Sequence, residues 1–110
     1  MLDYEAEHLD CEQDSERRRQ LRSFLIHCRS RLAPTELGLP LTPRRRVRGL
    51  RRGEVAELIG VTVDWYRHFE SGRQVRVSPR LVSRLAKALR LDPTQERALF
   101  RLSFLEMYHL

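Results

Sequence analysis

Histidine, cysteine and the acidic residues are the side chains of this chain that could bind a metal ion or transfer a proton. The four histidines lie far apart and do not form metal-binding clusters with cysteines or acids; they are His8, His27, His68 and His109. The sequence also has no glycine-rich loop typical of phosphate binding, and no serine near a plausible histidine and aspartate. These residues therefore predict no metal site, no cofactor and no catalytic activity.

Residues 63–68 carry side chains whose chemistry instead suits the edges of DNA bases. The guanidinium of Arg67 can bridge O6 and N7 of guanine or bind a phosphate. The carboxylate of Asp64 can accept a hydrogen bond from cytosine N4, or it can orient Arg67 or His68. Val63 can touch a thymine methyl group, whereas Trp65 can stack on a sugar or cover the preceding turn. A helix that lay in a DNA groove would offer to the bases the side chains of Val63, Asp64, Trp65, Arg67 and His68.

The residues just before this segment are predicted to form a short helix that supports it. Val55, Ala56 and Ile59 form an apolar stripe at helical spacing, with charged residues on the opposite face. Ala56 is small enough to allow a close helix crossing. Gly60 supplies the positive φ that ends a helix, so the turn that follows is short.

A second short helix should begin after Thr62, whose hydroxyl can accept a backbone N–H from the first turn. Tyr66 and Phe69 then face inward, and Gly72 ends the helix. The outward face is polar, as it is in a helix that lies in the DNA major groove. Residues 51–71 are therefore predicted to form a helix-turn-helix.

This segment resembles the λ-repressor-like, xenobiotic-response-element (XRE) family of helix-turn-helix regulators. The matching residues are Leu50, Val55, Ala56, Gly60, Val61, Thr62, Tyr66, Glu70 and Gly72. The resemblance implies that the positions of Val63, Asp64, Trp65 and His68 face base edges. It also implies that Glu70 is a structural residue, bonded to an arginine or a backbone N–H.

Within that family, the chain looks most similar to the MmyB-like branch over about residues 20 to 105. The shared elements are Arg44-Arg45-Arg46, Gly49-Leu50-Arg51-Arg52, Trp65-Tyr66 and the run from Gly72 to Pro79. Gly53 stands where the family usually has a helix former such as Glu, and Trp65 replaces a tyrosine. MmyB-like regulators usually carry a ligand-binding C-terminal domain, so the resemblance implies either a missing sensor domain or a minimal regulator.

The charge of the chain supports a nucleic-acid partner. Of its 21 basic residues, 20 are arginines, and seven of its 15 acidic residues lie in the first 16 positions. Residues 17–110 therefore carry a net charge of about +13. Such a charge attracts a polyanion through counterion release. We expect contacts to DNA phosphates from Arg44, Arg45, Arg46, Arg48, Arg51, Arg52, Thr62, Arg73 and Arg76.

Before the helix-turn-helix, residues 1–14 are predicted to form an acidic tail that is disordered or loosely docked. A helix should begin at Asp14 or Ser15 and continue to about Leu32, with Cys28 as a buried structural thiol on its apolar face. The prolines, glycines and arginines of residues 33–49 indicate a basic loop, with a turn around residues 35–37.

Two further helices follow the helix-turn-helix. Ser78 and Pro79 begin one that continues to about Arg90, and Asp92 and Pro93 begin another that continues to near Tyr108. On the last helix, Ala98, Leu102 and Leu105 are predicted to face the core. A second apolar stripe on its opposite side predicts contact with another subunit or domain, through Phe100, Phe104, Met107 and Tyr108.

The chain is thus predicted to be a single all-α domain, residues 15–110, with the five helices of a λ-repressor-like fold. No apolar run is long enough to span a membrane, and no signal peptide is apparent, so we expect a cytoplasmic protein. The predicted function is sequence-specific binding of double-stranded DNA by a homodimeric regulator, with repression as the expected effect. The alternative is a protein-interaction module, similar to an antitoxin or anti-sigma factor, that binds DNA only nonspecifically.

Overall fold

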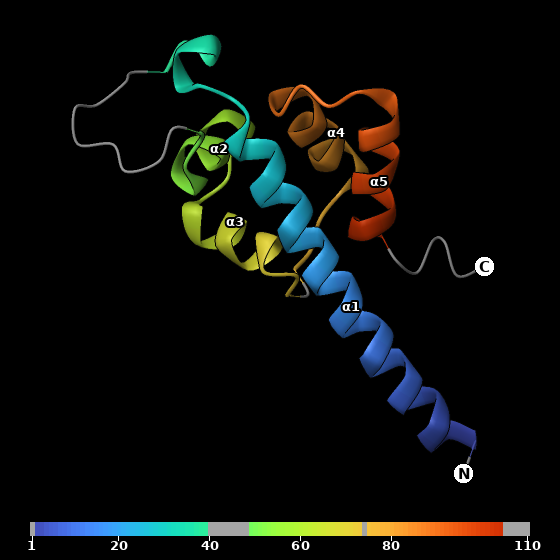
Figure 1. Ribbon diagram of the computed structural model, residues 1–110. Coiled ribbons are helices and arrows are strands. Elements are labelled where there is room, and N and C mark those ends of the chain that lie inside the picture. Colours follow the sequence, from blue (N-terminus) through green and yellow to red (C-terminus); the bar gives the residue numbers. More distant parts are fainter. Residues whose placement is uncertain (1, 40–48, 74, 105–110) are drawn as a thin grey trace.

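The computed structural model of the chain describes residues 2–39, 49–73 and 75–104, with side chains from Ser15 onward. Every regular element within these residues is helical (Figure 1). The elements are α1 (Leu2–Ser30), the 3-10 helix η1 (Pro34–Leu37), α2 (Arg52–Ile59), α3 (Val63–Glu70), α4 (Pro79–Ala88) and α5 (Pro93–Ser103). The predicted all-α fold with five α-helices is confirmed over the described residues.

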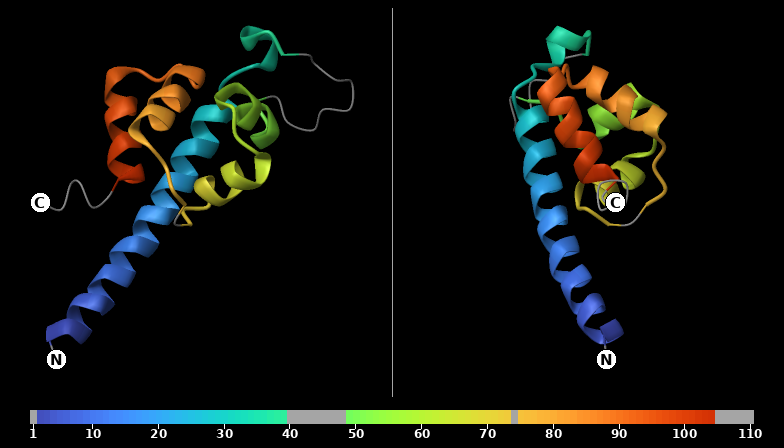
Figure 2. Two further views of the ribbon diagram at one scale, coloured as in Figure 1. Left: turned by 180° about the vertical axis from the view of Figure 1, so that it is seen from behind. Right: turned by 90° about the vertical axis from the view of Figure 1, so that its right-hand side faces the viewer.

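Helix α1 is longer than the sequence pattern predicted. It begins at Leu2, so the predicted start at Asp14 or Ser15 was wrong, and residues 2–14 have a helical backbone in place of the predicted tail. This segment contains no glycine or proline to interrupt a helix. Its acidic residues lie near the N-terminus, where negative charge interacts favourably with the helix dipole and stabilises the helix. The helix ends at Ser30, two residues before the predicted end. Its N-terminal half extends away from the other helices in each view (Figure 2).

The helix-turn-helix consists of α2 and α3, at residues 52–70, close to the predicted 51–71. Val55, Ala56 and Ile59 are buried, as predicted. Gly60 ends α2 with a φ of 77°, a left-handed conformation that disfavours other residues. The Thr62 hydroxyl then accepts a hydrogen bond from the Trp65 N–H at 3.1 Å and caps α3. Gly60 therefore determines where α2 ends, and Thr62 determines where α3 begins.

Helices α4 and α5 begin at the predicted caps. Ser78 accepts the Leu81 N–H at 3.1 Å, and Asp92 accepts the Gln95 N–H at 2.8 Å. Helix α5 ends at Ser103, because the backbone of Phe104 leaves the helical region at φ −127° and ψ 63°. The predicted continuation to near Tyr108 was therefore wrong, and residues 105–110 lie outside the described residues.

The core-facing side of α5 also differs from the prediction. Leu99 and Leu102 are buried, whereas Ala98 is only half-buried and Leu105 lies outside the described residues. Phe100 and Phe104 pack at the margin of the core and are not a fully exposed second stripe. The difference arises because α5 packs against both α1 and α4, which turns its contact face toward Leu99.

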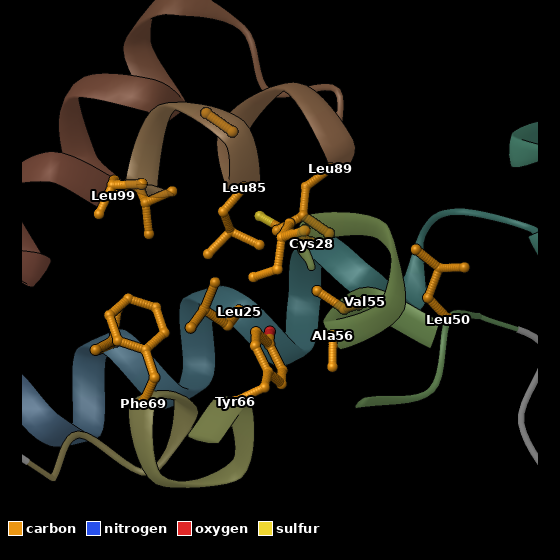
Figure 3. Packing of buried hydrophobic residues seen from close by; sticks show 14 of the residues in the cluster. Leu25, Cys28, Leu50, Val55, Ala56, Tyr66, Phe69, Leu85, Leu89 and Leu99 are labelled. Carbon is orange, nitrogen blue, oxygen red and sulfur yellow. The ribbon is translucent and has the colours of Figure 1, made fainter. Parts of the chain in front are cut away.

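One hydrophobic core joins all five α-helices (Figure 3). Leu25 and Cys28 from α1 meet Tyr66 and Phe69 from α3, and Leu85 from α4 lies on the opposite side. The other buried apolar residues are Leu21, Leu50, Val55, Ala56, Ile59, Val82, Ala86, Leu89, Leu99 and Leu102. Helix α1 thus packs against the buried side of the helix-turn-helix and supports it.

Candidate nucleic-acid interface

The two faces of α3 differ sharply in burial. Tyr66 and Phe69 are buried in the core, whereas Asp64, Arg67 and His68 are exposed. Val63, with 41% of its surface exposed, is the most exposed large apolar residue of the described part of the chain. An apolar side chain that stays exposed at the start of such a helix is available for contact with another molecule.

Asp64 and Arg67 form an ion pair on the outer face of α3. The distance from Arg67 Nη1 to Asp64 Oδ1 is 3.5 Å, and both side chains are largely exposed. An exposed pair of this kind contributes little to stability. Its effect is to limit the directions in which the Arg67 guanidinium points, which is one of the two roles considered for Asp64 from the sequence.

Trp65 is half-buried and lies against the core. Its ring stacks on that of Phe69 with a centroid distance of 5.3 Å and an interplanar angle of 10°. Because one ring face is covered in this way, Trp65 has a structural role in holding α3. The rest of its side chain is partly accessible.

Glu70 is the one charged side chain that is buried among the described residues, at 3% exposure. Both of its carboxylate oxygens accept hydrogen bonds from Arg29 of α1 at 2.9 Å, in a bidentate pair. The same Arg29 guanidinium donates to the Leu50 carbonyl at 3.1 Å. The hydrogen bond to Glu70 raises the pKa of Arg29. The structural role that the family resemblance implied for Glu70 is therefore present.

The arginine that pairs with Glu70 was not singled out in the sequence. Arg29 lies four residues after Leu25 and eight after Leu21, on the apolar stripe of α1. A charged residue at such a position needs a partner when it is buried. This break in the stripe was the signal that could have identified it.

Arg52, a predicted phosphate contact, also interacts with Glu70. Its Nε lies 3.4 Å from Glu70 Oε1, and the side chain is 44% exposed. The ion pair holds the guanidinium at the N-terminus of α2 while leaving part of it accessible. Arg51 precedes it and is exposed, and its backbone N–H donates to Glu54 at 2.8 Å.

The segment after α3 is fixed to α1 and α5. Gly72 has a φ of 80°, and a Cβ atom there would lie 2.5 Å from the side chain of Arg18. Arg17 donates to the Gly72 carbonyl at 3.0 Å and to the Leu102 carbonyl at 3.1 Å. Arg73 and Arg76 are exposed on this anchored loop, whereas Arg44, Arg45, Arg46 and Arg48 lie outside the described residues.

The structure describes two of the four predicted interface residues at the C-terminal end, Phe100 and Phe104. The rings of Phe100 and Phe104 lie 5.9 Å apart at an angle of 36°, and both are half-buried. A surface pocket of about 270 Å³ borders Phe100, next to Pro93, Glu96 and Arg97. Met107 and Tyr108 lie outside the described residues.

A short helix, a tight turn and a second helix with a polar outer face define the helix-turn-helix class of DNA-binding domain. The chain belongs to a family of helix-turn-helix domains, whose family model matches residues 36–100, more than half of the chain. No curated protein and no solved structure matches the chain significantly. In the part of the chain that the structure describes, no helix is long and apolar enough to cross a membrane.

Proposed function

We propose that this chain is a transcriptional regulator that binds double-stranded DNA sequence-specifically, with α3 in the major groove. The observation that carries the proposal is the division of α3 into two faces. Its inner face is fixed by Tyr66, Phe69 and the buried Glu70, whereas Asp64, Arg67 and His68 are exposed on the other. A helix held this rigidly can present side chains to base edges in a constant geometry.

Each exposed side chain of α3 suits a particular contact. Arg67 donates two hydrogen bonds to guanine, and Asp64 orients it through the ion pair described above. Val63 contacts a thymine methyl group. Two further residues complete the surface that faces the bases: Trp65 in the first turn of α3, and His68 one helical turn further along.

The phosphate contacts flank this surface. Thr62 lies at the N-terminal end of α3. Arg51 and Arg52 add positive charge at the N-terminus of α2, where Arg52 contacts Glu70 at the other end of α3. Arg73 and Arg76 lie on the loop beyond α3. The basic segment with Arg44, Arg45, Arg46 and Arg48 follows the backbone or enters the minor groove as an arm.

The regulator belongs, in this proposal, to the XRE class and resembles its MmyB-like branch. It binds as a homodimer to two half-sites separated by about 10 base pairs or a multiple of that distance. The proposed dimer or domain interface contains Phe100, Phe104, Met107 and Tyr108. Bound at a promoter in the cytoplasm, it acts by excluding polymerase and is thus a repressor without catalytic activity.

Selection of bound sequences from a random pool of duplex DNA by the purified chain, at near-physiological salt, tests the proposal. A recovered pseudo-palindrome would support a dimeric, sequence-specific regulator, and a single half-site would support the specificity but not the dimer. If no motif emerges, and affinity differs less than about tenfold between sequences, the chain is an interaction module or a nonspecific binder, since specific sites gain about 10³ or more.

A further inference from the structure

The C-terminal end of α3 is bordered by α1, and this contact brings a further arginine beside the proposed DNA interface. Arg18 of α1 packs directly against Gly72, and Arg29, three turns further along, pairs with Glu70. Arg22 lies between these two contacts. Figure 1 shows α1 passing the end of α3 at this level.

The side of α1 that carries Arg22 follows from helix geometry. Arg22 and Arg29 are seven residues apart, which places their directions within about 20° of each other on an α-helix. Because Arg29 points to α3, Arg22 lies on the same flank of the helix. It is exposed, whereas Leu25 one turn later is buried.

Nothing inside the described part of the molecule uses this guanidinium. The carboxylate of Glu70 is occupied by Arg29 and Arg52, and Glu16 pairs with Arg19 at 2.9 Å. The Arg22 guanidinium makes no hydrogen bond or ion pair with another described residue. An exposed cation without an acidic neighbour is available to an external anion.

The backbone carbonyls at the C-terminal end of α3 already accept hydrogen bonds from groups other than Arg22. The carbonyls of Arg67, His68 and Phe69 accept the backbone N–H groups of Ser71, Arg73 and Gly72 at 3.0–3.1 Å. The Gly72 carbonyl accepts from Arg17. A capping role for Arg22 is therefore not needed to explain its position.

The dimensions of the DNA groove bring a phosphate strand to this end of α3. A helix of eight residues is about 12 Å long, which is close to the width of the major groove. If α3 lies across the groove, its C-terminal end reaches the backbone that lines the groove edge. Arg73, exposed on the adjoining loop, lies at the same end.

From these contacts we infer that Arg22 binds a DNA phosphate together with Arg73, so that the interface extends from the helix-turn-helix onto α1. The inference rests on the proposed DNA binding. In this arrangement α1 both supports α3 from behind and anchors one edge of the groove.

The test compares the salt dependence of binding by the full chain and by its Arg22→Ala variant, with the selected duplex and with a random duplex. Loss of one phosphate contact should reduce the magnitude of the slope of log K against log salt by about 0.9. The affinity ratio of wild type to variant should accordingly shrink about threefold between 50 and 200 mM salt, equally on both duplexes. Arg22→Lys should keep the wild-type slope.

Arg97→Ala is the matched control, because it removes the same charge from an exposed position on the outer side of α5, where the described contact of Arg97 is with Thr94 at 3.4 Å. A slope for Arg22→Ala equal to that of Arg97→Ala would overturn the inference while leaving the proposed function intact. If the wild type itself shows no salt-dependent binding, the proposed function fails, and the inference fails with it.

Discussion

Two charged residues of α3, three positions apart, have different roles because one is buried and the other is exposed. Glu70 is buried and fully paired with Arg29, so its charge serves the fold. Arg67 is largely exposed and, among the described residues, is paired only with the exposed Asp64, so its charge remains available to a ligand. Burial, and not residue type alone, determines which of these two charged side chains is available to a ligand.

At the residue scale, Arg67→Ala should weaken binding to the selected site by about 1 to 3 kcal/mol and relax the preference at one base pair. Competition binding with single-base variants of the site measures this. An equal loss on all sequences would instead identify Arg67 as a phosphate contact.

The Tyr66 hydroxyl gives a prediction about stability. Its oxygen is buried and makes no hydrogen bond within the described residues. Leaving such a group without a partner costs about 1 to 3 kcal/mol. Tyr66→Phe should therefore leave the free energy of unfolding at neutral pH unchanged or raise it, as measured by denaturant titration. A loss of more than about 1 kcal/mol would show that the hydroxyl has a partner.

The same residue should also make stability depend on pH in the alkaline range. Burial, reinforced by the Glu70 charge, raises the pKa of Tyr66 well above its ordinary value. An unfolded tyrosine loses its proton near pH 10, whereas the folded one keeps it, so the wild type should lose stability as the pH rises above about 10. In Tyr66→Phe this part of the loss should be absent.

At the scale of elements, the Glu70 cluster connects the three helices on which the interface depends. Arg29 comes from α1, Arg52 from α2 and Glu70 from α3, and Arg29 also holds the segment before α2 through Leu50. Arg84 of α4 adds a hydrogen bond to the last carbonyl of α2, at Ile59. The orientation of α3 relative to α2 is thus set by paired charges as well as by apolar packing.

Removing one partner of this cluster should destabilise the domain strongly. Glu70→Ala leaves Arg29 largely buried without an anion, and such a change costs about 3 to 5 kcal/mol. Thermal unfolding followed by circular dichroism measures the loss. The double variant Arg29→Met with Glu70→Met should recover much of it, because an apolar pair replaces the ion pair. If Glu70→Ala unfolds like the wild type, the cluster does not stabilise the fold.

At the scale of the whole molecule, charge is unevenly distributed along the chain. The first 16 residues contain seven acids and no lysine or arginine, and the backbone of residues 2–14 leads away from the other helices (Figure 2). The helices that carry the proposed DNA contacts come from the basic remainder. The arrangement keeps the negative segment apart from α2 and α3.

The proposed homodimer gives a prediction at this scale. If Phe100 lies in the subunit interface, Phe100→Glu should convert a dimer into a monomer in sedimentation equilibrium, because the interface would bury an unpaired charge. Arg97→Ala, which borders the same surface pocket, should leave the dimer intact. Circular dichroism checks that both variants are folded. A monomeric wild type, alone and with DNA, would contradict the proposed interface.

Much of this protein could be predicted from short-range patterns. The helix-turn-helix, its turn at Gly60, and the caps Thr62, Ser78 and Asp92 depend on residues within a few positions of one another, and the structure has each of them as predicted. The exposed face of α3 also followed from its 3.6-residue period. The predicted DNA contacts themselves remain predictions.

The sequence by itself determined the elements and their limits wherever a cap or a glycine marks them, because those signals act through the nearest backbone groups. Only the tertiary structure decided that Arg29 pairs with Glu70, that Arg17 joins the loop at Gly72 to the end of α5, and that Leu99 faces the core. These contacts join residues distant in sequence or depend on how two helices pack. No local period encodes them, since they arise only when the helices meet.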